Sequence, residues 1–228
     1  MKSLIAFLIF FIPLSCIGQQ NEKFSIEVFA GPSMPLGKFA DKSYSQFNNS
    51  SGLAKVGFSF GSDVKFKMKN NFGIALDVSY SLNKQDKRAI ENYINRGSNY
   101  PLNTKIEVNS WQIARGLVGL YYQHLFKRTR LGFEISILAG VSKTAIPPYN
   151  WQVYTQSGNL YNSAQENKKQ LNWMFSYKIL SGINYKLNNR MYFLLNVSYF
   201  NAQTSRATSN LKYWFGSADV NGGLGFLL

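Results

Sequence analysis

The single histidine is the first residue to test for catalytic chemistry. His124 is followed by Leu125 and Phe126, so no serine stands at the offset that a His-x-Ser pair needs. A serine hydrolase requires a hydroxyl nucleophile within hydrogen-bond reach of its base. Because this pairing is missing from the sequence, we predict a structural role for His124, and we predict that the protein is not an enzyme.

Charged side chains are the second source of chemistry, because two carboxyl groups can act as general acid and base. Acidic and basic residues occur at every second position of segments whose other positions are apolar. This spacing places the charged residues on one face, together with small residues. The residues expected on this inward face are Glu27, Asp63, Asp77, Glu134 and Asp219, with Lys55, Lys65, Lys67, Arg115, Lys178 and Lys186. Buried charges have to be paired, since desolvating a single ion is costly. We therefore interpret them as an internal ion-pair network.

The chain offers little for metal, thiol or phosphate chemistry. Its one cysteine, Cys16, lies in the N-terminal apolar segment, and with one histidine this leaves no His/Cys metal site. We predict no catalytic, cofactor-binding or metal-binding residues and no cofactor. The net charge of +14 would suit nucleic acid. Zinc-ligand spacing and a helix-turn-helix pattern are both missing, so we expect no nucleic-acid partner and favour contact with anionic lipid.

The N-terminus has the pattern of a secretory signal peptide. Lys2 gives a short positive region, residues 4–12 form an unbroken apolar run, and small residues follow up to Gly18. The apolar run is too short to span a membrane as a helix, which takes about 20 residues. We place cleavage after Gly18, so that residues 1–18 are the signal peptide and residues 19–228 form one outer-membrane β-barrel domain.

An alternative interpretation makes Cys16 a lipid anchor. Leu14, Ser15 and Cys16 loosely resemble a lipoprotein cleavage box, although Pro13 stands where an aliphatic residue is preferred. No later segment of the sequence is apolar enough to form a membrane helix. If the mature chain enters a membrane, it must do so as a closed barrel, because lipid leaves no other way to satisfy the backbone hydrogen-bonding groups.

Alternation of apolar and polar residues is the dominant pattern of the mature chain. In residues 54–68 the even positions are mostly apolar and the odd positions are Lys, Gly, Ser or Asp. The same alternation continues in residues 72–82 after a turn at Asn70 and Asn71. A period of two predicts β-strands with one apolar face. Eight strands are predicted, over residues 24–31, 54–68, 72–82, 108–124, 131–142, 172–187, 191–199 and 211–228.

Short and long connections alternate between these strands. Short turns are expected at residues 70–71, 127–130 and 188–190, and long loops at residues 32–52, 83–105, 143–171 and 201–210. This layout is typical of bacterial outer-membrane barrels, with both termini on the periplasmic side. We predict an all-β fold, an eight-stranded antiparallel transmembrane up-and-down β-barrel. In a ten-stranded alternative, residues 151–161 enter the membrane as a further hairpin, with its turn at residues 157–159.

Two features favour a membrane barrel over a soluble barrel that surrounds a ligand. The less apolar face is rich in Gly, Ser, Ala and Asn, which suits a narrow lumen better than a water-facing surface. Aromatic residues gather near both strand ends, as in the girdles that flank a membrane. The long-loop girdle is expected at Tyr80, Trp111, Trp173, Tyr199 and Trp214, and the short-turn girdle at Phe66, Phe72, Phe133, Tyr185, Phe193 and Phe226.

The C-terminus carries a further signature. Asn221, Gly223, Phe226 and Leu228 have the spacing of the C-terminal assembly signal of outer-membrane barrels, with Leu228 in place of the usual aromatic residue. With the alternation, the loops and the girdles, this resembles the PorT-like family of small outer-membrane β-barrels and, more distantly, the OmpA/OmpX-type barrels. The resemblance covers the mature chain. It implies an integral outer-membrane protein and allows an accessory role in envelope secretion or assembly.

Three functions follow from these expectations. We favour a non-enzymatic outer-membrane protein with a structural or binding role at the surface, since loops carry function more often than scaffolds do. The loops contain Lys84, Lys87, Arg88, Tyr93, Arg96, Tyr100, Trp151, Tyr154 and Tyr161. The alternatives are an accessory component of a secretion or assembly machine and a lipid-modifying enzyme. Expected partners are outer-membrane lipid and lipopolysaccharide, with an envelope protein as a further candidate. The oligomeric state is not predicted. We do not expect a porin, because a water-filled solute channel needs about 16 strands.

Overall fold

The structure is a computed structural model, and it describes residues 23–42, 52–69, 71–96, 103–126, 129–147, 149–155, 157–166, 170–205 and 212–228. The predicted signal peptide and its cleavage site lie outside these residues. The elements are β1 (Phe24–Leu36), the 3₁₀ helix η2 (Gly37–Phe39), β2 (Gly57–Lys67), β3 (Phe72–Asn83), α2 (Lys87–Arg96), β4 (Asn103–Val108), β5 (Trp111–Leu125), β6 (Leu131–Ile146), β7 (Tyr149–Tyr154), β8 (Leu160–Glu166), β9 (Gln170–Lys186), β10 (Met191–Ser205) and β11 (Lys212–Leu227).

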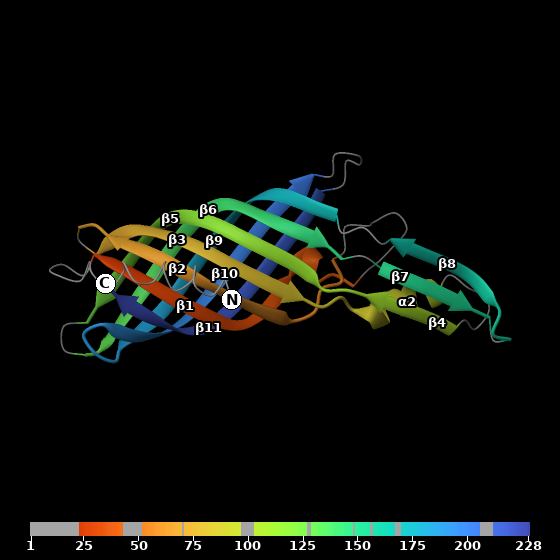
Figure 1. Ribbon diagram of the computed structural model, residues 1–228, viewed down its shortest axis with the longest axis horizontal. Helices are drawn as coiled ribbons and strands as arrows, with labels where there is room; N and C mark the ends of the chain where they lie inside the picture. Colours follow the sequence, from red (N-terminus) through yellow and green to blue (C-terminus); the bar gives the residue numbers. More distant parts are fainter. Residues whose placement is uncertain are drawn as a thin grey trace, which may run out of the picture.

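Eight strands form a closed barrel in the order β1-β11-β10-β9-β6-β5-β3-β2 (Figure 1). Every neighbouring pair is antiparallel. The prediction of an eight-stranded antiparallel up-and-down barrel is therefore confirmed. The ten-stranded alternative is wrong, because β7 and β8 do not enter the barrel. They form a separate three-stranded sheet in the order β4-β7-β8.

The short turns and the two ends of the described barrel lie at the same end. Ser25 at the start of β1 pairs with Leu227 at the end of β11, and pairing of these two strands closes the sheet. Closure removes the free strand edges that would otherwise pair with other chains. In the β2–β3 turn Asn71 has a φ of 69°, a left-handed conformation that asparagine tolerates well. In the β9–β10 turn the Asn188 side chain accepts hydrogen bonds from the amides of Arg190 and Met191.

Side chains alternate between the outside and the lumen, as predicted. On β6, Ile135 and Ile137 are 45% and 63% exposed, whereas Glu134, Ser136 and Leu138 are at most 2% exposed. The same alternation holds along the other barrel strands. The barrel therefore has its apolar face outward and its charged and small residues inward, which is the reverse of a soluble ligand-binding barrel.

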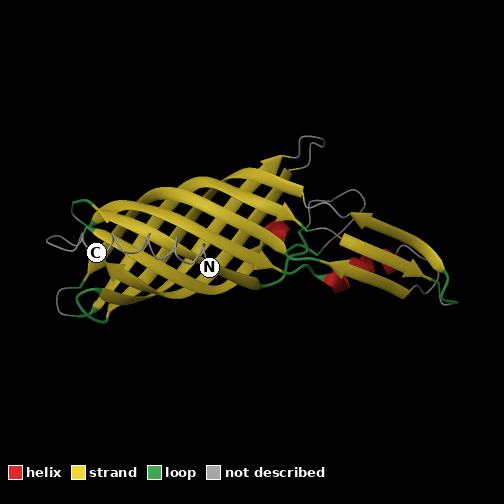
Figure 2. Ribbon diagram, in the orientation of Figure 1, coloured by secondary structure: helices red, strands yellow, loops and turns green. Residues whose placement is uncertain are grey.

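A small module extends beyond the long-loop end of the barrel (Figures 1 and 2). It consists of β4, β7, β8 and α2, and it buries Ile106 and Val153. The hairpin of β7 and β8 turns at the predicted place, where Gly158 has a φ of 82° and donates its amide to the Thr155 carbonyl. Strand β4 and helix α2 were not predicted. None of the helices among the described residues is long and apolar enough to cross a membrane.

The first long loop folds back into the barrel mouth. It places Phe39 of η2 against Trp111 and Phe215, with ring centroids 5.3 to 5.8 Å apart. The Trp111 indole donates a hydrogen bond to the Gly52 carbonyl at 2.8 Å. The prediction that Trp111 belongs to the outer girdle is wrong, because this residue faces the lumen and is 5% exposed. The other predicted girdle residues face outward.

Candidate functional site

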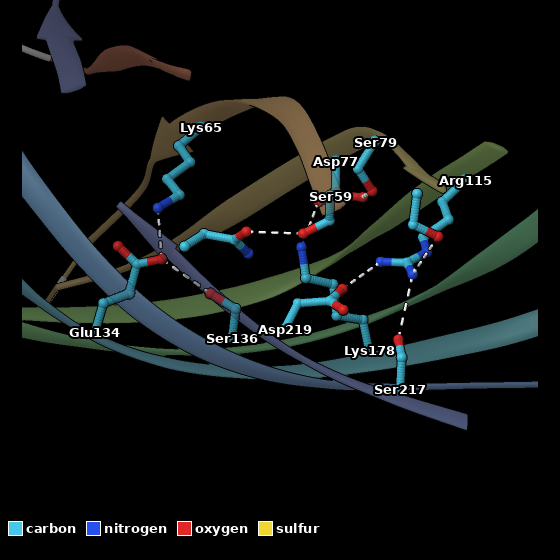
Figure 3. A network of polar contacts seen from close by, with 12 residues as sticks. Ser59, Lys65, Asp77, Ser79, Arg115, Glu134, Ser136, Lys178, Ser217 and Asp219 are labelled. Atoms are coloured by element: carbon cyan, nitrogen blue, oxygen red, sulfur yellow. Dashed lines mark hydrogen bonds and ion pairs between the residues drawn. The ribbon is translucent and has the colours of Figure 1, made fainter. Parts of the chain in front are cut away.

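The lumen contains three layers of paired charges (Figure 3). In the layer nearest the short turns, Lys65 lies between two carboxylates. Its ammonium group is 2.7 Å from Glu27 Oε1 and also pairs with Glu134. The Tyr192 hydroxyl donates to Glu27 at 2.6 Å, and the Ser136 hydroxyl donates to Glu134 at 3.0 Å. These five residues are almost completely buried, so their polar atoms satisfy one another and not water.

The middle layer has two carboxyl groups and one cation. Lys178 Nζ lies 2.6 Å from Asp77 Oδ2 and 4.9 Å from the centre of the Phe29 ring. The Ser79 hydroxyl donates to the other oxygen of Asp77 at 2.7 Å. Asp63 stands directly opposite Asp77 in the β2–β3 register and is 2% exposed. Lys178 therefore pairs with Asp77, while the buried Asp63 beside them makes no ion pair with a described residue.

The layer nearest the long loops is built around Arg115. Its guanidinium is 2.6 Å from Asp219 Oδ2 and donates to the hydroxyls of Ser81 and Ser217 at 3.1 and 3.3 Å. The Phe200 ring covers the guanidinium carbon at 4.0 Å, a favourable cation–π contact. Above this layer Phe39, Trp111 and Phe215, here called the Phe39 plug, pack together in the mouth. Buried side chains thus occupy the described lumen from the first layer to the plug.

The structure confirms the inward position of all five predicted carboxylates. Among the predicted inward cations it confirms Lys65, Arg115 and Lys178. Lys67 and Lys186 also stand on the inward face, opposite Gly73 and Tyr192, but at the short-turn mouth, where Lys67 is exposed and Lys186 is half-buried. The prediction is wrong for Lys55, which precedes β2, is exposed and pairs with Asp86. These three residues lie at strand ends, where a long side chain reaches water more easily than the lumen.

The surroundings of His124 are aromatic, and its ring has no hydroxyl hydrogen-bond partner among the described residues. The residue is half-buried at the short-turn end of β5, and its ring stacks edge-on against Phe126 and lies beside Phe133. Its Nδ1 is 3.5 Å from the Asn71 side-chain nitrogen. No group of three or more His, Cys, Asp or Glu residues suited to a metal ion occurs in the described part of the chain.

The short-turn mouth of the barrel holds a pocket. It has about 570 Å³ of empty space, part of it continuous with solvent. Tyr121 and Tyr192 form its inner wall, and both rings occupy space left by glycines. A Cβ atom at Gly73 would lie 2.4 Å from the Tyr121 ring, and one at Gly225 would lie 2.1 Å from the Tyr192 ring. These glycines therefore allow the tyrosines to turn into the lumen.

Asp86 links the module to the long-loop mouth of the barrel. Its carboxylate is 3.0 Å from Lys55 Nζ and 3.1 Å from Lys42 Nζ, and it accepts a long hydrogen bond of 3.4 Å from the Ala89 amide in α2. Burial raises the pKa of Asp86, but the hydrogen bonds from Lys55, Lys42 and Ala89 outweigh it, and the net pKa is below the usual value. Asp86 therefore links Lys42 of the first loop and Lys55, which precedes β2, to the first turn of α2.

The module presents a polar face. Lys105 and Glu107 of β4 are exposed, and the Lys105 ammonium lies 5.5 Å from the centre of the Tyr154 ring. The Tyr154 hydroxyl donates to Gln152 at 2.7 Å. Of the predicted loop residues, Lys84, Lys87 and Arg88 are exposed. Tyr100 and the side chains of Tyr93, Arg96, Trp151 and Tyr161 lie outside the described residues.

Comparison with solved structures finds outer-membrane and surface proteins of bacteria. Neisserial surface protein A has a TM-score of 0.49 and 10% identity, over 90% of this chain and 97% of that one. OprG of Pseudomonas aeruginosa has a TM-score of 0.45 and 13% identity, over 92% and 98%. Ail of Yersinia pestis has a TM-score of 0.42 and 11% identity, over 90% and 99%. No family model and no curated protein sequence matches the chain. Similarities this low do not indicate what the chain does.

Sequence reasoning missed the Phe39 plug, the Asp86 anchor and the pocket. The plug has no local signal, because its partners Trp111 and Phe215 are far away in sequence. Asp86 directly precedes a helix, where aspartate is a preferred capping residue, and this could have been noticed. The pocket could have been anticipated from the lysines that stand at strand ends on the short-turn side.

Proposed function

We propose that the protein is an integral protein of the bacterial outer membrane with both termini in the periplasm. The observation that carries the proposal is the exposed apolar outer face of a barrel whose described charged residues lie inside it or near its ends. Ile137 and Phe175, for example, are 63% and 69% exposed. A soluble protein rarely exposes contiguous apolar surface over more than a few hundred Å². Lipid is the environment that suits this face, and the closed barrel satisfies its backbone there.

The periplasmic assignment of the termini rests on the lengths of the connections. In bacterial outer-membrane barrels the short turns face the periplasm and the long loops face outward. The described ends of this chain share the short-turn end of the barrel, and the module lies at the other end. The module would then stand on the cell surface.

Within that membrane we propose a non-enzymatic structural or binding role for the module. Its support is architectural: a separate sheet and a helix project beyond the barrel, while the lumen is filled by ion pairs and an apolar plug. The exposed Lys105 and Glu107 give the sheet a polar face that suits contact with a hydrated surface partner. Outer-membrane lipid and lipopolysaccharide surround the barrel in this proposal.

Removal of the β7–β8 hairpin tests this role. A short glycine-rich turn would join Pro147 to Gln170, a change that costs little in loop-closure entropy. We expect the variant to reach the outer membrane and to remain folded, as judged by a shift in gel mobility on heating. Vesicles that carry the wild-type protein should bind intact bacterial cells in a saturable manner, and those that carry the variant should not. The double variant Lys105→Ser/Glu107→Ser keeps the hairpin and should bind more weakly. Undiminished binding after removal of the hairpin would refute the role of the module.

A second candidate is an accessory role in an envelope secretion or assembly machine. It is favoured by the resemblance of the C-terminal signature and the loop layout to the PorT-like family. Cross-linking in living cells distinguishes the two proposals. A machine component should give a stable complex with other envelope proteins that survives removal of the hairpin, whereas a surface-binding protein should lose its partner. A lipid-modifying enzyme would instead change the mass of lipid A.

A further inference from the structure

The short-turn mouth brings together three lysines from distant parts of the chain. Lys23 precedes β1, Lys67 ends β2 and Lys186 ends β9, and all three line the same pocket. The Lys67 amide donates to the Lys23 carbonyl at 2.7 Å, so these two residues are direct neighbours. No acidic side chain lines the pocket. Three like charges around one cavity create a positive potential that attracts an anion.

Lys23, Lys67 and Lys186 have no anionic partner among the described residues. Every ion pair between described residues involves other cations, namely Lys42, Lys55, Lys65, Lys87, Arg115 and Lys178. The positive charge at this mouth is therefore available to a ligand.

Neutral donors and apolar groups complete the pocket. The Tyr121 hydroxyl and the Gln123 side chain line it and make no hydrogen bond among the described residues. Leu125 and Leu227 supply apolar surface beside them. A ligand that satisfies all these groups has an acidic head that accepts hydrogen bonds and an apolar part that covers the leucines.

The pocket is closed on its inner side. Below it lie Glu27 and Glu134, and Lys65 pairs with both of these carboxylates. Tyr192 donates to Glu27, and the Asn184 amide lies 3.4 Å from Glu134. These contacts cover the two carboxylates, so that they oppose an anion in the pocket less than free carboxylates would. The buried ion pairs of Lys65 separate the pocket from the middle of the lumen.

We infer that this mouth binds an amphipathic organic anion, a phosphate or carboxylate group attached to a short apolar chain. Lys23, Lys67 and Lys186 neutralise the acidic group, Tyr121 and Gln123 donate hydrogen bonds to it, and Leu125 and Leu227 contact the apolar chain. The same head group occurs on soluble organic anions and on the anionic lipids of an adjoining leaflet. The site is independent of the role proposed for the module, which lies at the other end of the barrel.

Calorimetric titration of the full mature protein with octyl phosphate tests the inference, in non-ionic detergent and below the micelle concentration of the ligand. We expect one saturable site. The variant Lys67→Ser/Lys186→Ser should bind about tenfold or more weakly, because charge-assisted hydrogen bonds are lost. The matched control Lys38→Ser/Lys84→Ser removes the same charge from exposed residues at the other end of the barrel and should keep wild-type affinity. Heat-shifted gel mobility shows that each variant is folded.

Three further ligands separate the contributions of the acidic group and the apolar chain, and distinguish a lipid from a soluble ligand. Inorganic phosphate and octanol should each bind more weakly than octyl phosphate, because each lacks one half of the recognised structure. Phosphatidylglycerol in nanodiscs should displace octyl phosphate if the ligand is a lipid, and should leave its binding unchanged if the ligand is soluble; either result is consistent with the site. The inference is overturned if octyl phosphate shows no saturable binding, or if the Lys67/Lys186 variant and the control bind it equally well.

Discussion

Lys178 is the residue on which the middle of the lumen depends. It is 1% exposed and is the ion-pair partner of Asp77, which faces Asp63 directly across the β2–β3 register. The variant Lys178→Met would leave two buried carboxyl groups next to each other without a cation. Removing one partner of a buried pair typically costs about 3–5 kcal/mol. We expect a loss of that order in the free energy of unfolding, measured by urea titration in lipid vesicles.

The matched variant Lys178→Met/Asp77→Asn serves as the control. It removes the cation together with one carboxylate, so a single acidic residue remains at the position of Asp63. The loss of stability should then be clearly smaller than that of Lys178→Met alone. If the two variants were equally unstable, packing of the lysine stem and not charge pairing would explain the effect.

For individual residues, the sequence predicted the facing of side chains well in the strand interiors and poorly at the strand ends. Glu134 and Lys178 could be placed in the lumen because a strict period of two fixes which face each residue occupies. Lys67 and Lys186 follow the same period, but they stand where the strand leaves the barrel and their side chains reach solvent. Trp111 was misplaced for another reason, since its partners Phe39 and Phe215 are not visible from local alternation.

Strand β3 gives the clearest test of which face meets lipid. Leu76 lies in the middle of the strand, faces outward and is 45% exposed. Arginine at the bilayer midplane of a barrel costs roughly 2–4 kcal/mol. Leu76→Arg should therefore destabilise the folded protein in vesicles by about this amount. Leu160→Arg is the control, because Leu160 is 58% exposed but belongs to the module. Equal and small effects of the two substitutions would argue against a lipid-facing β3.

The contact between the module and the barrel should weaken in acid. The pKa of Asp86 in the folded protein is lowered, so its contribution to stability is present above the ordinary aspartate pKa and is lost as the pH falls through the folded pKa. The protection factors of the α2 amides, which correct for the intrinsic pH dependence of exchange, should therefore be lower below about pH 4 than at neutral pH. Asp86→Asn should show low protection factors at both pH values. Protection factors in the wild type that do not change with acid would contradict the anchoring role of Asp86.

At the level of elements, the barrel strands were predictable and the module was only partly so. Each barrel strand carries its own alternation and its own turn signal, such as Asn71, so local sequence suffices. The β7–β8 hairpin was also visible through its turn around Gly158. Strand β4 and helix α2 are short and polar, and they are held by each other and by β7, which no local pattern reveals.

The whole molecule is organised as a filled barrel with different surfaces at its two ends. Lys65, Lys178 and Arg115 hold the three charged layers, and the plug around Phe39 closes the long-loop mouth. The module stands beyond that mouth, and the basic pocket lies at the other. This arrangement favours contacts at the ends of the barrel over transport through it. We propose that lipid surrounds the apolar outer face between these ends.

Quenching of tryptophan fluorescence by brominated lipid reports directly on whether lipid covers this face. Trp173 faces outward and is 66% exposed, whereas Trp111 faces the lumen and is 5% exposed. Each would be kept as the sole tryptophan, with the others replaced by phenylalanine, and reconstituted in vesicles with bromine on the upper acyl chain. We expect strong quenching of Trp173 by the lipid, and weak quenching of Trp111 by both the lipid and aqueous acrylamide. Strong quenching of Trp173 by acrylamide without quenching by brominated lipid would contradict the membrane placement.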